Sequence, residues 1–172
     1  MAFHIVFGIA LLSFAIHLWM IRDRGLSSDR VVELGLLYLL AGVWGIGGAL
    51  FALPHILIPD EIAGYVGWPP GGLFQVELGF ASLGTSIVAI LCIWLRGWFW
   101  LSPIVAKSVF LLGAAYLHVR DVVESQNFEP GNAGPVLFYD LAIPFLTIVL
   151  FLKYRKSDEF RRASADPLRA TG

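Results

Sequence analysis

The residues with the clearest capacity for chemistry are acids and imidazoles inside otherwise apolar stretches. Glu77, His118 and Asp140 are of this kind, and Asp121 follows His118 by three residues, which places both on one face of a helix. His55 lies at the end of another apolar stretch. Moving a charged group from water into apolar surroundings is costly unless the group is paired. Each of these side chains is therefore expected to have a partner or a function.

Together these residue types suit a metal or ligand site. Carboxylate oxygens and imidazole nitrogens are ligands that zinc, iron and manganese accept. Pro144 lacks an N–H, so the carbonyl oxygen of Asp140 loses its helical donor and becomes one more acceptor. We expect Glu77, His118 and Asp140 to lie close together and to bind a divalent metal or another small ligand. Asp121 and His55 are expected as additional members of this site.

Two other interpretations fit the same residues. The cluster can be purely structural, with His118 held between Glu77 and Asp140 or Asp121 to close one end of a helix bundle, as in a structural or interaction subunit of a membrane complex. It can also belong to a small transporter or a proton pathway. The chain has no glycine-rich phosphate loop and no nucleophile elbow, so no catalytic residue and no reaction are predicted.

Lys107 raises a separate question, because it also lies well inside an apolar stretch. Side chains on a helix tilt toward its N-terminus, so the ammonium group is expected to reach back toward that end. Glu33 is the nearest counter-charge by sequence position. Since burying two opposite charges together lowers the cost of each, we expect a structural ion pair between Glu33 and Lys107 rather than a catalytic lysine.

The composition predicts the elements that carry these residues. Of 172 residues, 58% are hydrophobic and 15% are charged, and the mean hydropathy is +0.75. A soluble protein typically has about 25% charged residues, so a soluble domain is disfavoured. The predicted class is all-α, a polytopic transmembrane helical bundle of residues 1–152, with a four-helix core and an additional N-terminal span. Five apolar runs are near the roughly 20 residues that cross a bilayer, namely 2–21, 31–53, 74–95, 98–119 and 135–152.

Basic residues predict the orientation of this bundle. With the N-terminus outside, ten of the twelve Lys and Arg residues fall on the cytoplasmic side, where short loops are enriched in them. Trp19, Trp94, Trp98 and Trp100 fall at span ends on that same side, where indole rings prefer the boundary of the membrane. We therefore predict an inner-membrane protein with an outer N-terminus and a cytoplasmic C-terminus. The candidate site then lies in the outer half of the membrane.

The C-terminal residues and the net charge of the chain indicate which partners to expect. Residues 153–172 are polar and basic, which predicts a disordered cytoplasmic tail near anionic lipid. A net charge of −1 gives nucleic acid no general attraction to the chain. The lipid bilayer is the expected partner, and association with another protein or with a second copy of this chain stays open.

Small residues predict how the spans pack. Ala81 and Gly84 lie beneath Glu77 in the third span, and Gly45 lies in a similar run in the second span. Small side chains let helix backbones approach in lipid, where apolar burial alone does not favour one neighbour over another. These runs are interpreted as packing seams rather than as sites. Because Glu77 shares the face of such a seam, it is predicted to point into the bundle.

The two long connections, 54–73 and 127–135, lie on the same side as the polar cluster. The first contains Gly67-Trp68-Pro69-Pro70-Gly71-Gly72, and the second contains Glu129-Pro130-Gly131-Asn132. Proline fixes φ and glycine permits positive φ, so both segments are expected to be defined turns. The first connection is predicted to be either a lid over the cluster or a shaped link.

Several short motifs make the chain similar to a known family. They are Gly67-Trp68-Pro69-Pro70, Phe74-Gln75-Val76-Glu77, the run 110–118 that ends in His118, Pro130-Gly131-Asn132-Ala133-Gly134-Pro135, and Asp140 with Pro144. With these motifs the chain resembles small bacterial multi-pass membrane proteins catalogued as a domain of unknown function. The resemblance covers about residues 31–152, leaves the first span outside, and implies an integral inner-membrane protein without a known activity. The topology is also faintly similar to that of DoxX-like proteins.

Overall fold

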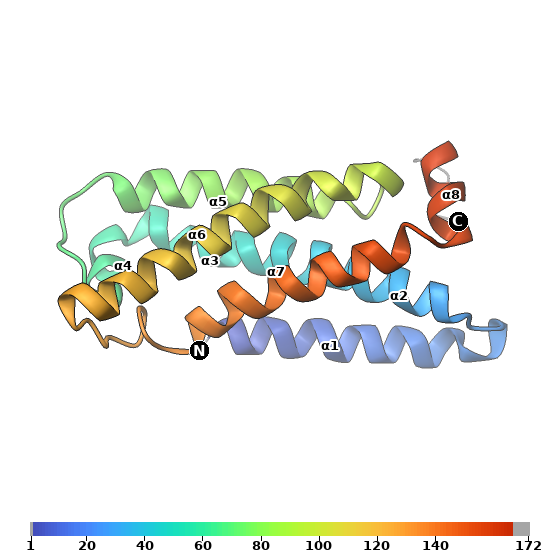
Figure 1. The fold of residues 1–172 in the computed structure, drawn as a ribbon, viewed down its shortest axis with the longest axis horizontal. Helices are drawn as coiled ribbons and strands as arrows, with labels where there is room; N and C mark the ends of the chain where they lie inside the picture. The colour runs from blue at the N-terminus through green and yellow to red at the C-terminus, as the bar shows by residue number, and fades with distance from the viewer. Residues whose placement is uncertain (1, 167–172) are drawn as a thin grey trace.

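The computed structural model describes residues 2–166 of the chain. Long helices run side by side in an elongated bundle (Figure 1). Among the described residues there is no strand, and the predicted all-α class is confirmed. In chain order the helices are α1 (Ala2–Ile21), η1 (Arg22–Arg24), α2 (Ser28–Leu37), η2 (Tyr38–Gly47), α3 (Gly48–Leu57), α4 (Pro59–Val66), α5 (Phe74–Leu91), η3 (Gly97–Trp100), α6 (Leu101–Ser125), α7 (Pro135–Tyr154) and α8 (Asp158–Ala165).

Five helical stretches are long and apolar enough to cross a membrane, which agrees with the five predicted spans. They indicate a multi-pass membrane protein. The second is longer than the predicted 31–53, because Ser27 caps it: the Ser27 hydroxyl accepts a hydrogen bond from the Arg30 N–H at 3.1 Å. Hydropathy detects the apolar part of a helix and misses a polar first turn. The stretches are His4–Ile21, Ser28–Leu57, Phe74–Leu91, Gly97–Ser125 and Pro135–Tyr154.

The middle of the second span, η2, is a π-helix that packs against α5 and α1. Glycines allow this close approach. A Cβ atom at Gly45 would lie 2.7 Å from Ile90, and one at Gly47 would lie 2.8 Å from Val6. The packing role predicted for Gly45 is confirmed. At Gly84 a Cβ atom would meet nothing within 4 Å, so the predicted seam on α5 is wrong.

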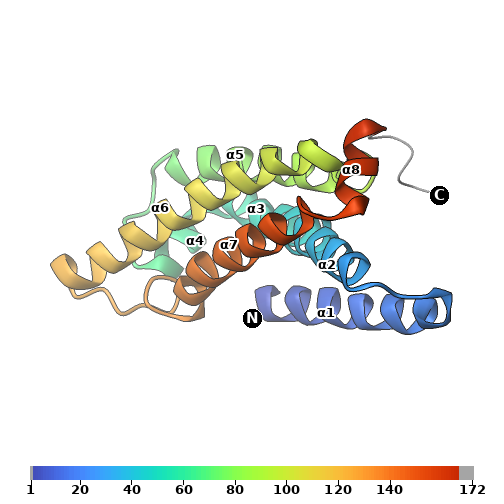
Figure 2. The same ribbon diagram turned by 45° about the vertical axis from the view of Figure 1, so that its right-hand side comes forward.

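The connections gather at two opposite ends of the bundle (Figures 1 and 2). We call one the loop end, which contains α4 and the connections 67–73 and 126–134. The other is the basic end, which contains the turns 22–27 and 92–96, η3 and α8. At the basic end Glu33 is buried, accepts a hydrogen bond from Arg96 at 2.9 Å and pairs with Arg30.

The basic end differs from a set of exposed span ends and a disordered tail. Trp100 lies near the start of its span, as predicted, but it is fully buried, since its indole N–H donates to the Cys92 carbonyl at 3.0 Å and its ring stacks on Tyr154 with centroids 4.8 Å apart. Residues 158–165 form helix α8 rather than a disordered tail. Ser157 caps this helix and buried Phe160 anchors it. Residues 167–172 of the predicted tail lie outside the described residues.

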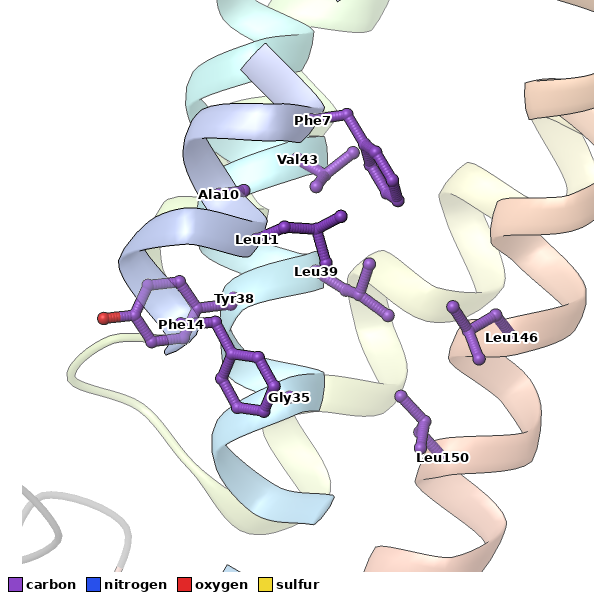
Figure 3. Close-up of a pocket in the computed structure, with 10 residues that line it drawn as sticks. All are labelled: Phe7, Ala10, Leu11, Phe14, Gly35, Tyr38, Leu39, Val43, Leu146 and Leu150. Atoms are coloured by element: carbon purple, nitrogen blue, oxygen red, sulfur yellow. The ribbon is translucent and has the colours of Figure 1, made fainter. Parts of the chain in front are cut away.

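Helix α1 lies at the periphery of the bundle, because only 6% of residues 4–21 are buried. This position fits a four-helix core with one additional span. Two hydrogen bonds hold it near its ends, one between His4 and Tyr139 and one between His17 and Tyr38 at 3.2 Å. Between them is an apolar cavity of about 150 Å³, lined by residues of α1, α2, η2 and α7 (Figure 3). None of the predicted site residues lines this cavity.

The single cysteine of the chain offers a direct test of the fold. Cys92 is fully buried at the end of α5, and this burial raises the pKa of its thiol to about 12. Because the thiolate is the nucleophile, a raised pKa removes it at neutral and mildly alkaline pH. We expect folded protein to resist a membrane-permeant maleimide at pH 8 and SDS-unfolded protein to be fully labelled, as measured by mass spectrometry. Rapid labelling of the folded protein would show that this end of α5 is misplaced.

Candidate functional site

The structure brings His118 and Asp140 together near the loop end. His118 lies in the last third of α6, and Asp140 lies in the second turn of α7, which packs along α6. Both side chains are buried, at 8% and 6% exposure. The Nε2 atom of His118 lies 4.0 Å from Oδ2 of Asp140. This 4.0 Å separation, called the gap below, is too long for a direct hydrogen bond and too short to place an atom directly between the two groups, so a ligand atom can bridge them only from beside both.

Asn132 determines which nitrogen of His118 faces Asp140. The Nδ2 group of Asn132 donates to the Asn127 carbonyl at 2.8 Å, so its Oδ1 atom is an acceptor. That Oδ1 lies 2.7 Å from Nδ1 of His118, which must therefore carry a proton. In a neutral imidazole the other nitrogen has a lone pair, so Nε2 presents that lone pair to Asp140.

A second layer of polar contacts covers this pair from the loop end. The ring of Trp68 stacks on that of His118, with centroids 6.1 Å apart and planes at 19°. The Trp68 indole N–H donates to Oδ2 of Asp121 at 3.0 Å, and the same oxygen accepts from the Asn127 amide at 2.6 Å. Asp121 therefore positions Trp68 and Asn127 above His118.

Gly67 allows Asn127 and Trp68 to pack together over His118. Its φ is +83°, and an added Cβ atom would lie 2.6 Å from the Oδ1 of Asn127. The amide of Asn127 also donates to the Val66 carbonyl at 2.8 Å. A side chain at Gly67 would thus combine backbone strain with displacement of an amide that holds two elements together.

We expect Gly67→Ala to lower the free energy of unfolding by about 2–3 kcal/mol, from positive-φ strain plus the loss of hydrogen bonds to Asn127. Gly71→Ala is the matched control, because Gly71 has φ +87° but open space around its Cβ position. Strain alone predicts a loss of about 1 kcal/mol there. Thermal unfolding of the purified protein compares the two. Equal losses would show that Asn127 does not contact Gly67.

Glu77 does not join this site, and the prediction that it points into the bundle is wrong. Its side chain lies on the exposed face of α5. The buried face of that helix instead carries Gln75, Gly79, Ser82 and Ser86. At Gly79 the helix packs closely on α3, because an added Cβ atom would lie 2.6 Å from Cγ1 of Ile56 and 3.1 Å from the carbonyl oxygen of Ala52. The seam at Gly79 therefore sets the rotation of α5 and turns Glu77 outward.

His55 has a different partner from the one predicted. It is buried at the end of α3, and its Nδ1 atom lies 2.7 Å from Oε1 of Gln75 on α5. Its ring also lies against Phe51, with centroids 4.6 Å apart. His55 thus belongs to the contact between α3 and α5 rather than to the pair formed by His118 and Asp140.

The predicted ion pair between Glu33 and Lys107 is also wrong. Glu33 binds Arg30 and Arg96, as described above. Lys107 is buried, at 3% exposure, and its ammonium group contacts Oγ of Ser86 at 3.1 Å and both Oγ and the carbonyl of Ser82 at 3.4 Å. Arg96 lies in the turn after α5, at the same end of the bundle as Glu33, and it therefore pairs with Glu33 in place of Lys107.

The number of available ligand atoms limits how a metal could be held by His118 and Asp140. Within residues 2–166 no group of three or more His, Cys, Asp or Glu side chains is arranged to hold a metal ion. Catalytic zinc sites usually have about three protein ligands and structural ones about four. His118 and Asp140 can supply two ligand atoms, so a metal held by this pair would need further ligands from outside the protein.

The amides Asn127 and Asn132 are residues of the candidate site that sequence reasoning missed. Asn132 is fully buried, and it fixes the orientation of His118. The connection 127–135 was predicted to be a turn, but amides in turns usually bind their own backbone. The available signal was the position of two amides in the connection that joins the spans of His118 and Asp140.

Comparison with known proteins agrees with the predicted resemblance and extends it. No curated protein and no solved structure matches the chain. A family model described as "Family of unknown function (DUF6790)" matches residues 1–160. The match includes the first span and ends at residue 160, in the first turn of α8, so the expectation that the first span lies outside the resemblance is wrong. This chain therefore belongs to the family of unknown function DUF6790.

Proposed function

We propose that this protein is a multi-pass inner-membrane protein that binds a small ligand between His118 and Asp140 in the outer half of the bilayer. The N-terminus and the loop end then face outward, and the basic end faces the cytoplasm. The distribution of basic residues supports this orientation, since Lys and Arg favour cytoplasmic loops. The observation that carries the ligand site is the 4.0 Å gap between two buried polar groups.

The chemistry of the gap favours a ligand with hydrogen-bond donors. Because Asn132 accepts from Nδ1–H of His118, Nε2 of the neutral imidazole can accept a hydrogen bond from a hydroxyl or amine. The carboxylate of Asp140 accepts a second hydrogen bond or attracts a cation. The imidazole requires no rearrangement to bind, because Asn132 and Trp68 hold His118 in place. A divalent metal with additional small ligands is the alternative occupant of the same gap.

Trp68 gives this site a cover. Its ring lies over His118 and is half-buried at the loop end, where the connection 67–73 continues along the surface. Displacement of this connection would open the gap toward the outer side without moving a span. The hydrogen bond from Trp68 to Asp121 holds the cover closed.

The test is purification of the protein from its membrane in lipid nanodiscs, followed by native mass spectrometry and elemental analysis. We expect a bound small molecule or metal that is lost in His118→Ala and in Asp140→Asn. His17→Ala is the matched control, since His17 also has a hydrogen-bond partner but lies on α1. Retention of the bound species in all variants would refute the site. Ligand-free protein that copurifies with a stoichiometric protein partner would support an interaction subunit instead.

A second candidate function, a proton pathway, is favoured by Lys107. Within residues 2–166 this buried cation has hydroxyl and carbonyl partners and contacts no acid. An ionisable residue inside a membrane bundle often marks an ion or proton path. Proteoliposomes that contain a trapped pH dye would test this function. A proton flux that Lys107→Met and Asp140→Asn both abolish would support it, and flux equal to that of empty liposomes would exclude it.

A further inference from the structure

The apolar cavity beside α1, called the α1 cavity below, lies at the middle of the spans. Its volume is about 150 Å³, and side chains of α1, η2 and α7 line it. Phe7 and Phe14 mark its extent along α1, about two helical turns apart, inside the apolar stretch His4–Ile21. In a membrane-spanning bundle this level is surrounded by the hydrocarbon chains of lipids.

The α1 cavity opens sideways, between α1 and α7. Both helices pack on the second span, α1 on η2 and α7 on α2. Helix α7 begins near the N-terminal end of α1 and separates from it toward the basic end (Figures 1 and 2). Leu11 of α1 and Leu146 of α7 reach into the cavity from opposite sides (Figure 3), and they are 50% and 40% exposed. The two walls of the entrance therefore face the surroundings of the protein.

The floor of the α1 cavity is closed. Leu39 and Val43 of η2 form it, at 7% and 2% exposure. Aromatic contacts bound the cavity along the helix axis. Phe7 lies against Tyr139 with ring centroids 6.1 Å apart, and Phe14 lies against Tyr38 with centroids 5.7 Å apart. The cavity is thus a slot whose entrance is the lateral one between α1 and α7.

The lining suits hydrocarbon and does not suit water. The hydroxyl of Tyr38 is already bound to His17 at 3.2 Å, and the other side chains that line the slot are apolar. A buried water molecule needs about two to four polar partners, which this lining does not supply. An apolar cavity of similar volume in a soluble protein binds benzene, so about six carbon atoms fit. A whole helix, about 10 Å across, is too wide.

An acyl chain meets all of these conditions, because it is narrow, apolar and present at this level of the membrane. We propose that the α1 cavity binds an acyl chain of a membrane phospholipid, which enters between α1 and α7 and lies on Leu39. The bound chain contacts buried residues of η2. It differs in this respect from the lipid that surrounds every span, which touches exposed residues only.

The bound chain also fastens α1 to the bundle. Hydrogen bonds hold α1 near its two ends, from His4 to Tyr139 and from His17 to Tyr38. Between these contacts α1 and α7 lie on opposite sides of the slot, and an acyl chain there contacts both. Since a ligand that binds only the assembled form stabilises it, the chain and the docking of α1 are expected to stabilise each other.

The experiment is photolabelling of the full chain in vesicles of phosphatidylcholine that contain a phosphatidylcholine with a diazirine in one acyl chain. Mass spectrometry then locates the labelled residues. We expect labels on Leu39 or Val43, which are buried, as well as on exposed positions such as Leu12. If Leu12 is labelled and the η2 floor is not, the chain stays outside the slot and the proposal is wrong.

Variants separate the slot from general contact with lipid. Leu11→Trp and Leu146→Trp each place a larger ring in the slot, one from each wall. Labelling of Leu39 and Val43 should fall about tenfold in both, because extra volume in a filled site is unfavourable. The matched controls are Leu12→Trp and Leu141→Trp, exposed leucines of the same two helices that do not line the slot, and both should keep the label.

Two further outcomes would overturn the proposal. One is labelling of the η2 floor that is equal in all four variants, since a chain in the slot must respond to added volume. The other is a stable dimer in native mass spectrometry from nanodiscs, combined with protection of Leu11 and Leu146 from the label. That result would show that a second copy of this chain covers the entrance between α1 and α7.

Discussion

Glu33→Gln is expected to lower the free energy of unfolding by about 3–5 kcal/mol, because it leaves the guanidinium of Arg96 buried without its carboxylate. Glu33 is 3% exposed, and its contact with Arg96 joins α2 to the turn after α5. Removal of one partner from a buried pair is far more destabilising than removal of both, since the remaining charge has lost its solvent and its counter-ion. Titration of the purified protein with SDS, followed by circular dichroism, measures the loss.

Glu124→Gln provides the matched control for this change. Glu124 also pairs with an arginine, Arg120 at 2.8 Å, but both side chains are more than half exposed. A pair in water typically contributes less than about 1 kcal/mol, so the control should be close to wild type. The two variants make the same chemical change in different surroundings. If Glu33→Gln is as mild as the control, Arg96 is accessible to water and the basic end is not sealed.

Lys107→Met is expected to raise the free energy of unfolding by about 1–3 kcal/mol, the opposite sign to Glu33→Gln. Its ammonium group is buried among the hydroxyls of Ser82 and Ser86 and a carbonyl, with no carboxylate of the described residues in contact with it. Methionine fills a similar volume and removes the cost of burying the charge. Ser86 keeps an internal partner, because its hydroxyl donates to the Ser82 carbonyl at 2.7 Å. SDS titration compares this variant with Lys153→Met, an exposed lysine that should change little.

A double-mutant cycle with Lys107→Met and Glu33→Gln tests the placement of both residues. Because Lys107 contacts α5 and Glu33 contacts two arginines, their effects should add within about 0.5 kcal/mol. Coupling above about 1 kcal/mol would restore the ion pair predicted from the sequence and would require a different rotation of α6. Destabilisation by Lys107→Met alone would show that the ammonium group has an anionic partner in the membrane.

The sequence by itself determined the fold class and the spans, because both depend on local quantities. A run of about 20 apolar residues crosses a bilayer whatever its neighbours are. Each of the five predicted spans contains a long apolar helix. The second begins earlier because Ser27 caps it, and the third ends at Leu91 rather than at residue 95. The placement of His118 and Asp140 at one level was also predictable, since depth follows from position along each span. The cost of burying such groups identified them without any knowledge of the packing.

Tertiary structure decided the rotation of each helix about its own axis, and with it the membership of the site. Inside a membrane both the protein interior and the lipid are apolar, so hydropathy does not distinguish the two faces of a span. Glu77 faces outward because α5 packs at Gly79, and Lys107 meets the serines on that same buried face of α5. Asn132 reaches His118 only because the turn before α7 folds back over α6. These contacts join residues far apart in the chain, so they depend on steric fit between helices rather than on local sequence.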